Sequence, residues 1–426
     1  MSPHYVLDAR TATPHFPGIG RYVTALARAL PPLLAPDERV TLLYDAAHSA
    51  ALPPPSTGLA MLPVAATPFS ARQQWSMPRV LRQAQADLYH SSYYLMPYFP
   101  GVPALLTVYD LIPLVLPEQS SARARLFFRW TCGRALRTAR HVIAISEATR
   151  RDYLAHFHLP AGPEGIEVIP LAADPRFRPQ PPEAMAAVRD RYGLPERFVL
   201  YVGSNKPHKN LVGLVEAWGI LRGRDRGEAL DRRGGAGLQL VVAGPWDDRY
   251  VAPRRRAEAL GLRDAIHWLG PTSDADLPAL YAAASLFVFP SLYEGFGLPV
   301  LEAMACATAV VCSDRSSLPE VAGDAALLVD PHDGVRLADT IEQVLGDDGL
   351  RQGMCERGLE RASQFTWEQT AQRTLDAYRR NASNGTRPTP SLQSRASPSL
   401  QSRASPSLWS RASPSLRSRA SPQAGR

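Results

Sequence analysis

The strongest constraint on the fold is an alternation between short apolar runs and longer amphipathic segments. In the first half of the chain the apolar runs are HYVLD (4–8), RVTLLY (39–44), PALLTVY (103–109) and RHVIAIS (140–146). In the second half they are RFVLYVGS (197–204), LQLVVAGP (238–245), AIHWLG (265–270), SLFVFPS (285–291) and TAVVCS (308–313). Alternating strands and helices indicate parallel sheets that are covered by helices on both faces. The pattern therefore predicts an α/β protein made of two doubly wound, Rossmann-like domains.

A proline-rich segment, IPLAADPRFRPQPPEA (169–184), separates the two sets of runs. Its five prolines disfavour a helix or strand interior, so we interpret it as a hinge. We place the first domain at 1–175 and the second at 176–380, and the last helix of the second domain is free to return to the first. Ligands of doubly wound sheets bind at the carboxyl ends of the strands, which predicts a site in the cleft between the domains.

The tail, 381–426, repeats an eight-residue unit of the type SPSLQSRA. Its Ser, Pro and Arg cannot form a packed core, so we predict disorder. The tail contains seven arginines and no acidic residue, which equals the net charge of +7 and leaves the rest of the chain neutral. We therefore expect no nucleic-acid partner. A repeat expansion without function and a tether both remain open for this segment.

Other features of the composition limit the setting of the protein. No stretch approaches the ~18 uninterrupted apolar residues of a membrane-spanning helix, and the start, MSPHYVLDAR, has no signal-peptide pattern. The four cysteines show no C-x-x-C spacing: Cys132, Cys306, Cys312 and Cys355. We interpret them as reduced thiols of a cytoplasmic enzyme.

The most informative loop lies in FPSLYEGFGLPVLEAMA (289–305), between a strand and a helix. Gly295 and Gly297 permit a tight turn, and Pro299 suits the first turn of a helix. The N–H groups near Gly297 and Leu298 would carry the partial positive charge of a helix N-terminus. Such a terminus is a typical diphosphate site.

Two carboxylates, Glu294 and Glu302, bracket this turn. A carboxylate repels phosphate, so we expect these two to accept hydrogen bonds from the hydroxyl groups of a ribose and a sugar. A helix cap and a solvent-facing glutamate are the alternative interpretation.

A second loop, in YVGSNKPHKN (201–210), contains the only lysines of the chain, Lys206 and Lys209, among 47 basic residues. Gly203 and Ser204 form its turn. Where a plain positive charge suffices, this chain uses arginine, so the paired lysines suggest a compact ammonium group. Neutralising a departing diphosphate is a role that fits.

Three further strand ends carry candidate residues. Gly18 and Gly20 form a short glycine turn in PHFPGIGRY (14–22), a weak signal by itself. Asp110 and His90 each follow or end a buried strand. Both are candidate sugar ligands, with Asp110 also a candidate base, and structural hydrogen bonding is an equally open interpretation of each.

These motifs resemble the retaining glycosyltransferases of family 4, which have the two-domain GT-B fold. The E-x7-E spacing from Glu294 to Glu302 carries the resemblance. GIGRY (18–22), ISEATRRD (145–152), VIPLAAD (168–174) and SDRSSLPEVAGDAALLVDP (313–331) agree with it. The similarity covers 1–380, and the motifs are most similar to those of bacterial mannosyltransferases of polysaccharide and lipopolysaccharide synthesis.

The resemblance implies a role for each candidate residue. Glu302 would bind the donor ribose, Glu294 the donor sugar and Lys209 the diphosphate. The backbone of the turn would hold sugar and diphosphate through Gly295, Phe296, Gly297 and Leu298. Gly18 and Gly20 would approach the donor phosphates and the acceptor, which assigns the first domain to the acceptor side and the second to the nucleotide sugar.

The sequence departs from the family pattern at two positions. Many members have an arginine where this chain has Ser204, and Lys206 is positioned to supply that charge. Many also have a histidine where this chain has Tyr109 and Asp110, so the sugar-contacting histidine lacks a clear counterpart.

The implied reaction transfers a hexose with retention of configuration. Front-face displacement and double displacement through Asp110 both remain open. Since no D-x-D or histidine cluster is placed for a metal, we expect no metal and no cofactor. The resemblance favours GDP-mannose as donor, with a saccharide or a polyprenyl-diphosphate-linked saccharide as acceptor. The alternatives are a UDP-sugar donor, or a nucleotide-sugar epimerase or hydrolase of the same fold.

A basic segment, SARARLFFRWTCGRALRTAR (121–140), has six arginines and no acidic residue. Helical spacing predicts a core stripe of Phe128, Cys132, Ala135, Leu136 and Ala139. The opposite arc holds Arg123, Leu126, Arg129, Trp130, Arg134, Arg137 and Arg140. Such an arc suits an anionic membrane surface, with a peripheral location on the inner face of the cytoplasmic membrane. A solvated arginine face is the alternative.

Overall fold

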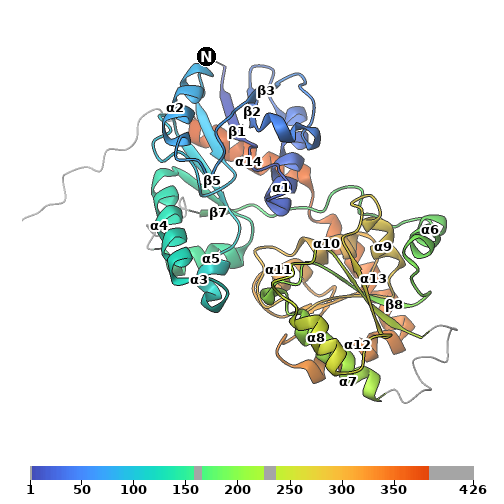
Figure 1. The fold of residues 1–426 in the computed structure, drawn as a ribbon. Helices are drawn as coiled ribbons and strands as arrows, with labels where there is room; N and C mark the ends of the chain where they lie inside the picture. Colours follow the sequence, from blue (N-terminus) through green and yellow to red (C-terminus); the bar gives the residue numbers. More distant parts are fainter. Residues whose placement is uncertain (1, 158–165, 225–236, 383–426) are drawn as a thin grey trace, which may run out of the picture. The chain divides into compact units, whose positions relative to one another are not determined.

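The computed structural model describes residues 2–157, 166–224 and 237–382, shown as coloured ribbon in Figure 1. The repeat tail lies outside the described residues, so its predicted disorder stays a prediction.

The first half of the described chain contains a seven-stranded parallel sheet in the order β3-β2-β1-β4-β5-β6-β7. Its strands are β1 (His4–Asp8), β2 (Arg39–Tyr44), β3 (Leu59–Pro63), β4 (Leu88–Ser91), β5 (Ala104–Val108), β6 (His141–Ala144) and β7 (Ile166–Val168). Tyr5 pairs with Val40 on one side and Leu88 on the other. This order places β1 and β4 in the middle, with the chain wound outward in both directions.

Helices cover both faces of this sheet. They are α1 (Pro17–Ala29), η1 (Pro31–Leu33), η2 (Ala46–Ala51), α2 (Gln73–Gln83), α3 (Ile112–Val115), η3 (Pro117–Gln119), α4 (Ala122–Thr138) and α5 (Glu147–His156). Side chains of a strand alternate between faces, so Tyr5 and Leu7 join the core beneath α1 while Val6 joins the core beneath α2 and α4. Both cores are fully buried at β1, as the apolar run HYVLD predicts.

The second half repeats the arrangement with a six-stranded parallel sheet in the order β10-β9-β8-β11-β12-β13, counted within the described ranges. Its strands are β8 (Phe198–Val202), β9 (Gln239–Ala243), β10 (Ile266–Gly270), β11 (Leu286–Phe289), β12 (Val310–Ser313) and β13 (Leu327–Val329). The predicted fold class, two doubly wound parallel sheets, is therefore confirmed. Edge strands β3, β7 and β13 were not predicted because they are short and partly exposed.

The helices of the second half form two groups. They are α6 (Pro182–Tyr192), η4 (Pro207–Lys209), α7 (Leu211–Arg224), α8 (Ala252–Ala259), α9 (Leu277–Ala283), α10 (Leu298–Ala305), α11 (Leu318–Ala322), α12 (Gly334–Gly346), α13 (Asp348–Ser363) and α14 (Trp367–Ala382). One group packs α7 with α8 and α12, and the other packs α10 with α9 and α13 (Figure 1).

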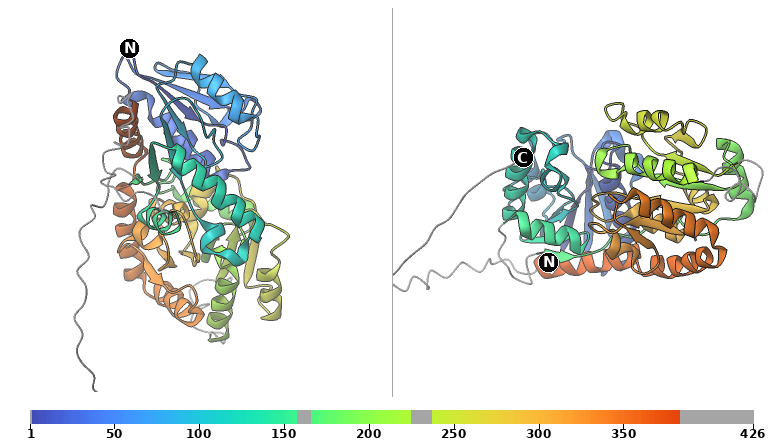
Figure 2. Two further views of the ribbon diagram at one scale, coloured as in Figure 1. Left: turned by 90° about the vertical axis from the view of Figure 1, so that its left-hand side faces the viewer. Right: turned by 90° about the horizontal axis from the view of Figure 1, so that it is seen from below.

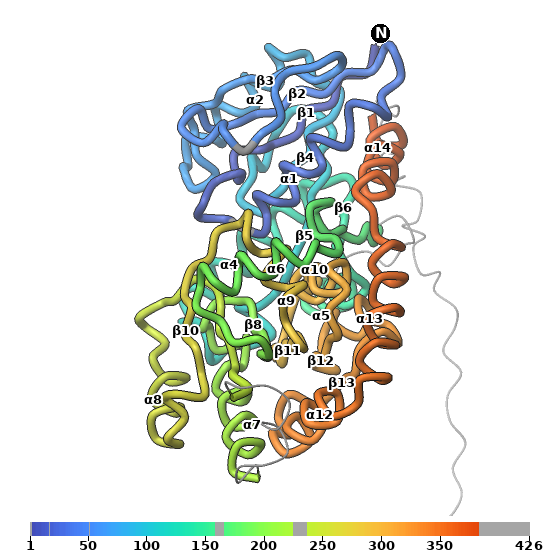
Figure 3. The backbone as a smooth tube through the Cα atoms, turned by 90° about the vertical axis from the view of Figure 1, so that its right-hand side faces the viewer, coloured from blue at the N-terminus to red at the C-terminus, as the bar shows by residue number. Residues whose placement is uncertain are grey.

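The last helix, α14, leaves the second half and packs against α1 and β4 of the first, as the tube in Figure 3 shows. Arg379 donates to both carboxylate oxygens of Glu38 at 2.8 and 2.7 Å, and Thr370 donates to the carbonyl of Pro170 at 2.8 Å. The C-terminal helix therefore completes one face of the N-terminal sheet.

In the described part of the chain, no helix is long and apolar enough to span a membrane. The four cysteines are free thiols, three of them buried and Cys355 partly exposed.

Candidate functional site

The loop between β11 and α10 is shaped by two glycines. Gly297 adopts φ +113°, and a Cβ there would lie 2.6 Å from Cδ2 of Leu318, so only glycine fits this position. Leu298 and Pro299 then open α10 directly behind the turn. Pro299 has no N–H group and is therefore tolerated in this first turn. The other N–H groups of the turn have no partner within the helix, and they lie near the carboxyl ends of the strands because α10 begins shortly after β11.

Lys209 and Glu294 lie together at the carboxyl ends of β8 and β11. Nζ of Lys209 is 2.7 Å from Oε1 of Glu294, which also accepts a 2.6 Å hydrogen bond from Ser291. The ammonium group sits 5.2 Å from the centre of the Phe289 ring. Asn210, with φ +54°, turns the chain so that Lys209 ends its short helix facing this loop. The carboxylate and the ring hold the ammonium group in one position.

Asp110 joins this pair from the N-terminal half. It follows β5, is half-buried, and accepts a 3.2 Å hydrogen bond from the N–H of Ile112. Desolvation raises the pKa of Asp110; the charge of Glu294 adds to the rise, and the charge of Lys209 opposes it. Glu294 and Lys209 are thus close enough to affect the pKa of Asp110.

Gly295 forms the closest contact between the two halves at this site. A Cβ at Gly295 would lie 2.4 Å from the carbonyl oxygen of Tyr109 and 3.4 Å from Cβ of Asp110. Its own carbonyl oxygen accepts hydrogen bonds from Ser146 at 2.7 Å and Thr149 at 3.0 Å. The φ of Gly295 is not positive, so its backbone conformation does not require glycine. The close approach to the Tyr109 carbonyl oxygen does.

Two further contacts tie the same loops together, and neither was predicted from the sequence. The hydroxyl of Tyr293 donates to Asp152 at 2.7 Å. The carboxylate of Glu320 accepts from the N–H of Glu147 at 2.9 Å, at the start of α5. Both contacts involve the ISEATRRD segment, which pairs once with the loop before α10 and once with the SDRSSLPEVAGD segment. The side chains of these segments gave no local sign of a partner so far along the chain.

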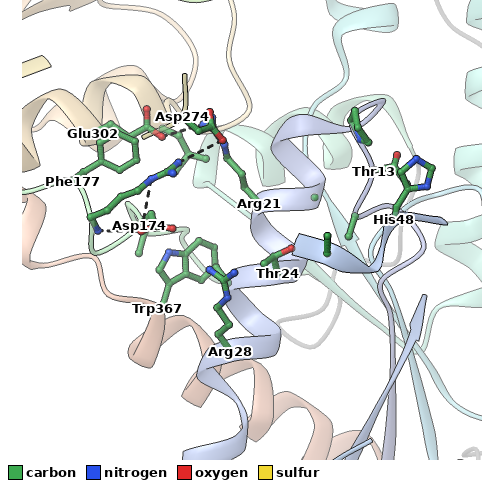
Figure 4. A pocket seen from close by; sticks show the side chains of 18 of the residues that line it. Thr13, Arg21, Thr24, Arg28, His48, Asp174, Phe177, Asp274, Glu302 and Trp367 are labelled. Carbon is green, nitrogen blue, oxygen red and sulfur yellow. Dashed lines mark hydrogen bonds and ion pairs between the residues drawn. The ribbon is translucent and has the colours of Figure 1, made fainter. Parts of the chain in front are cut away.

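Glu302 is buried on α10 and forms part of a cavity of about 570 Å³ (Figure 4). Arg21 of α1 lies 3.3 Å from its Oε1, and the Tyr281 hydroxyl donates to its Oε2 at 3.1 Å. Burial raises the pKa of Glu302, while Arg21 and Tyr281 oppose the rise. Figure 4 shows Arg21 reaching across the cavity toward Glu302 and Asp274, which it contacts at 3.2 Å.

Arg21 and Tyr281 are the main functional candidates that sequence reasoning missed. Arg21 directly follows Gly20 in GIGRY, so its position in a cleft-facing loop was a usable signal. Tyr281 lies inside an apolar helix, where nothing distinguishes it from a core tyrosine.

The remaining residues of the β8 loop surround Lys209. Gly203 lies under the Tyr201 hydroxyl, which would be 2.8 Å from a Cβ there and which donates to the carbonyl of Ser204 at 2.8 Å. Lys206 is exposed and lines a separate cavity of about 640 Å³ with Arg249. Its charge still lowers the pKa of Asp110, so it lies within electrostatic range of the site.

Gly18 and Gly20 lie in the first turns of α1 rather than in a separate glycine turn before it, and their roles differ. Gly20 is buried, lines the Glu302 cavity, and would bring a Cβ within 3.4 Å of the Thr11 carbonyl oxygen. Gly18 is exposed, and a Cβ there would meet nothing within 4 Å. Packing within the described residues therefore explains Gly20, and it gives no reason for glycine at position 18.

His90 does not lie in the site, which corrects its placement as a sugar ligand. It is fully buried in β4, its Nδ1 is 2.6 Å from the Tyr378 hydroxyl of α14, and its Nε2 is 2.7 Å from Oγ1 of Thr107. Both ring nitrogens are engaged, so none is available to a ligand. Burial lowers the pKa of His90 to about 3.

Replacing His90 by alanine is expected to reduce the free energy of unfolding by about 2–4 kcal/mol, because it opens a cavity and removes a partner of two buried hydroxyls. The stability is also expected to depend on pH. A neutral, buried histidine stabilises the fold above the unfolded pKa of 6.5. This contribution is lost as the pH falls from 6.5 toward 3, by up to about 1.4 kcal/mol per pH unit.

Thermal melts of the wild type and His90→Gln at pH 7 and pH 5 measure this contribution. The wild type should lose more of its Tm than the variant on acidification. An equal loss of Tm in both proteins would show that His90 does not cause the pH dependence of stability.

Among the described residues, no group of three or more histidine, cysteine, aspartate or glutamate side chains is arranged to hold a metal ion. The ammonium group of Lys209 and the N-terminus of α10 are the positive groups at the strand ends. Their geometry suits an anionic group flanked by hydroxyls.

Comparisons with known proteins agree with this geometry. Residues 188–361 match the family model for glycosyl transferases group 1, and residues 17–177 match the model for glycosyltransferase family 4. O-antigen chain mannosyltransferase B of Escherichia coli is 34% identical over 312 residues, which make up 72% of this chain and 77% of that protein.

Two solved structures show the same fold. Sucrose-phosphate synthase from Thermosynechococcus elongatus superposes with a TM-score of 0.68 at 23% identity, covering 89% of this chain and 98% of that one. Anabaena Alr3699/HepE, solved in complex with UDP and glucose, gives 0.68 at 19% identity, covering 89% and 100%.

Proposed function

Because this chain belongs to the family 4 glycosyltransferases with the GT-B fold, we propose that it transfers mannose from GDP-mannose to a saccharide or polyprenyl-diphosphate-linked saccharide. The product would be part of a polysaccharide or O-antigen. The E. coli relative is named as an O-antigen chain mannosyltransferase, which supports this choice of sugar and of pathway class.

The observation that carries the proposal is the convergence of Lys209, Glu294 and the N-terminus of α10. Lys209 and the helix N–H groups would neutralise the diphosphate as it leaves. Glu294 would accept hydrogen bonds from hydroxyls of the donor sugar, and Glu302 from those of the ribose. The 2.7 Å contact of Lys209 with Glu294 fixes the ammonium group beside the position that the sugar would take.

Front-face displacement with retention is the mechanism we favour. The acceptor oxygen bonds to the anomeric carbon while the bond from that carbon to the phosphate oxygen breaks on the same face. A phosphate oxygen takes the hydroxyl proton as the diphosphate departs. Double displacement would need an ionised Asp110, and both burial and the neighbouring Glu294 raise the pKa of that carboxyl group. The protein contributes position and charge without a metal or a cofactor.

A thermal-shift screen tests the donor. GDP-mannose at about 100 times its Kd should add ~2.7 kcal/mol to stability and raise the Tm by several degrees. Turnover with a mannose-ended saccharide should then release GDP. If a UDP-sugar stabilises the protein and supports turnover while GDP-mannose does neither, the mannose assignment fails.

The second candidate is a UDP-sugar transferase. The similar structure of Anabaena Alr3699/HepE, which was solved with UDP and glucose, favours this alternative. An epimerase or hydrolase of the same fold would release nucleotide at the full rate without any acceptor. Measuring nucleotide release with and without added saccharide separates these from a transferase.

A cytoplasmic location at the membrane is the last part of the proposal, and α4 supports it. Its buried face is Phe128, Thr131, Cys132, Gly133, Ala135 and Leu136, close to the predicted core stripe. On the opposite side of this helix, which is drawn in teal in Figure 2, Leu126, Phe127 and Trp130 are exposed by 70%, 57% and 59%. Arg123, Arg129 and Arg137 are exposed around them.

Vesicle flotation tests this surface. Three exposed arginines near an anionic surface would contribute about 1 kcal/mol each. We expect the protein to float with phosphatidylglycerol vesicles and not with phosphatidylcholine vesicles. The double variant Phe127→Ala, Trp130→Ala should lose most of this vesicle binding. The control Trp75→Ala, which removes an equally exposed tryptophan on α2, should keep it. Equal recovery with both lipids would exclude the membrane role.

A further inference from the structure

A second cavity, of about 290 Å³, adjoins the Glu302 cavity within the N-terminal half. The two cavities share Thr13, Pro14 and His48 as lining residues. Thr13 and His48 appear together at one side of Figure 4, with Glu302 at the other. The second cavity therefore continues the first in the direction away from Glu302.

One wall of this second cavity is aromatic. The rings of Phe16 and Phe69 stack with centroids 5.5 Å apart, and His15 meets the edge of Phe69 at 5.6 Å. Phe69 remains 56% exposed although it is apolar. Tyr93 continues the row, with its ring centroid 5.0 Å from that of Phe16. Burial raises the pKa of Tyr93, and the charge of Asp110 adds to the rise.

The cavity is also lined by Arg10, whose positive charge is already neutralised. Arg10 is buried and paired with Asp8 at 2.6 Å. Its remaining donors go to the carbonyl of Ala66 and to Gln73. Four of the five N–H groups of Arg10 are used in these bonds and its charge is paired with Asp8, so it is a poor partner for an incoming anion. The cavity is thus unsuited to a phosphate.

The rim supplies polar groups for a neutral ligand. The Asp45 carboxylate accepts from the N–H of Ala47 at 3.0 Å and lies 3.2 Å from Nδ1 of His48. A carboxylate and an imidazole can exchange hydrogen bonds with hydroxyl groups, while aromatic faces cover the apolar C–H surface of a pyranose ring. This combination of an aromatic wall with a few polar groups is typical of small-ligand sites.

We propose that this cavity is the subsite for a neutral hexopyranose unit of the acceptor, and that Phe69 is its main specificity-determining contact. The inference rests on the proposed function, since it assigns the acceptor side of that reaction. A volume of 290 Å³ lies at the small end of ligand pockets, so it fits one or two sugar units rather than a polyprenyl chain.

The test compares Phe69→Ala with Phe69→Tyr and with a matched control, Phe99→Ala. Phe99 is also exposed, by 75%, but lies outside the aromatic wall. With an α-linked mannobiose as soluble acceptor, Phe69→Ala should raise the acceptor KM about tenfold or more, because an apolar contact of one phenyl ring is lost. The donor KM and the acceptor-free hydrolysis rate should stay within twofold. Phe69→Tyr and Phe99→Ala should resemble the wild type.

Saturation-transfer NMR with the same mannobiose, without donor, gives a readout that does not need turnover. We expect the signal to be lost in Phe69→Ala and kept in Phe99→Ala, with mannose 6-phosphate competing no better than methyl α-mannoside. An unchanged KM and signal in Phe69→Ala, or stronger competition by the phosphate, would overturn the subsite. If the wild type transfers no hexose at all, the proposed function fails, while the NMR experiment still decides whether this cavity binds a neutral sugar.

Discussion

Replacing Lys209 by alanine is expected to lower kcat by roughly 10²–10³, the effect of removing one preorganised donor from a developing oxyanion. The ammonium group is held by Glu294 at 2.7 Å and by the Phe289 ring, with 17% of the side chain exposed. It therefore needs no reorganisation when negative charge develops on the departing diphosphate. The loss should fall on kcat more than on the donor KM, because this interaction strengthens as the bond breaks.

Lys209→Arg separates position from charge. Arginine keeps the positive charge, but its planar fork is larger than an ammonium group and cannot occupy the same point between carboxylate and ring. We expect only partial recovery of kcat. Wild-type kcat in Lys209→Arg would show that charge alone is needed and that the scarcity of lysine in this chain carries no information.

Two controls complete the Lys209 experiment. Lys206→Ala removes the only other lysine, which is exposed and lines a separate cavity, so its effect should be much smaller. The double variant Lys209→Ala, Glu294→Gln removes the carboxylate charge that the single variant leaves without its cation. If the loss in Lys209→Ala came from that unpaired carboxylate unfolding the loop, Lys209→Ala would have a lowered Tm and the double variant would regain it.

The sequence predicts the two sheets well because buried parallel strands are continuous apolar runs. It also predicts which loops reach the site, since each candidate loop follows the carboxyl end of a strand. Lys209, Glu294 and Asp110 lie near one another for this reason, although they come from three different strands.

Residue partners far apart in the chain could not be predicted. His90 and Asp110 both occur at strand ends, yet only His90 is covered by α14, through a hydroxyl 288 positions away. Arg21 and Glu302 meet across 281 positions. Such contacts depend on how the second half and the last helix pack on the first, and a local pattern does not carry that information.

Gly295→Ala is expected to lower kcat/KM by about 10² or more with little loss of thermal stability. The added Cβ would lie 2.4 Å from the carbonyl oxygen of Tyr109, a backbone atom that cannot rotate away. The loop must therefore shift by several tenths of an ångström or more, and it holds Glu294 and the start of α10. A displacement of about 1 Å in a catalytic group is enough for such a loss.

The structure supplies a matched control in Gly346→Ala, at the end of α12, where a Cβ meets nothing within 4 Å. This variant should keep wild-type kinetics. In Gly295→Ala the Tm should fall by only a few degrees, because the strained contact lies at one loop and the buried strands of both sheets are unchanged. Measuring kcat and the donor KM distinguishes the causes: a displaced Lys209–Glu294 pair lowers kcat, whereas a distorted diphosphate turn also raises the donor KM. Wild-type kcat/KM in Gly295→Ala would mean that the close approach of Gly295 to Tyr109 is not part of the catalytically active arrangement.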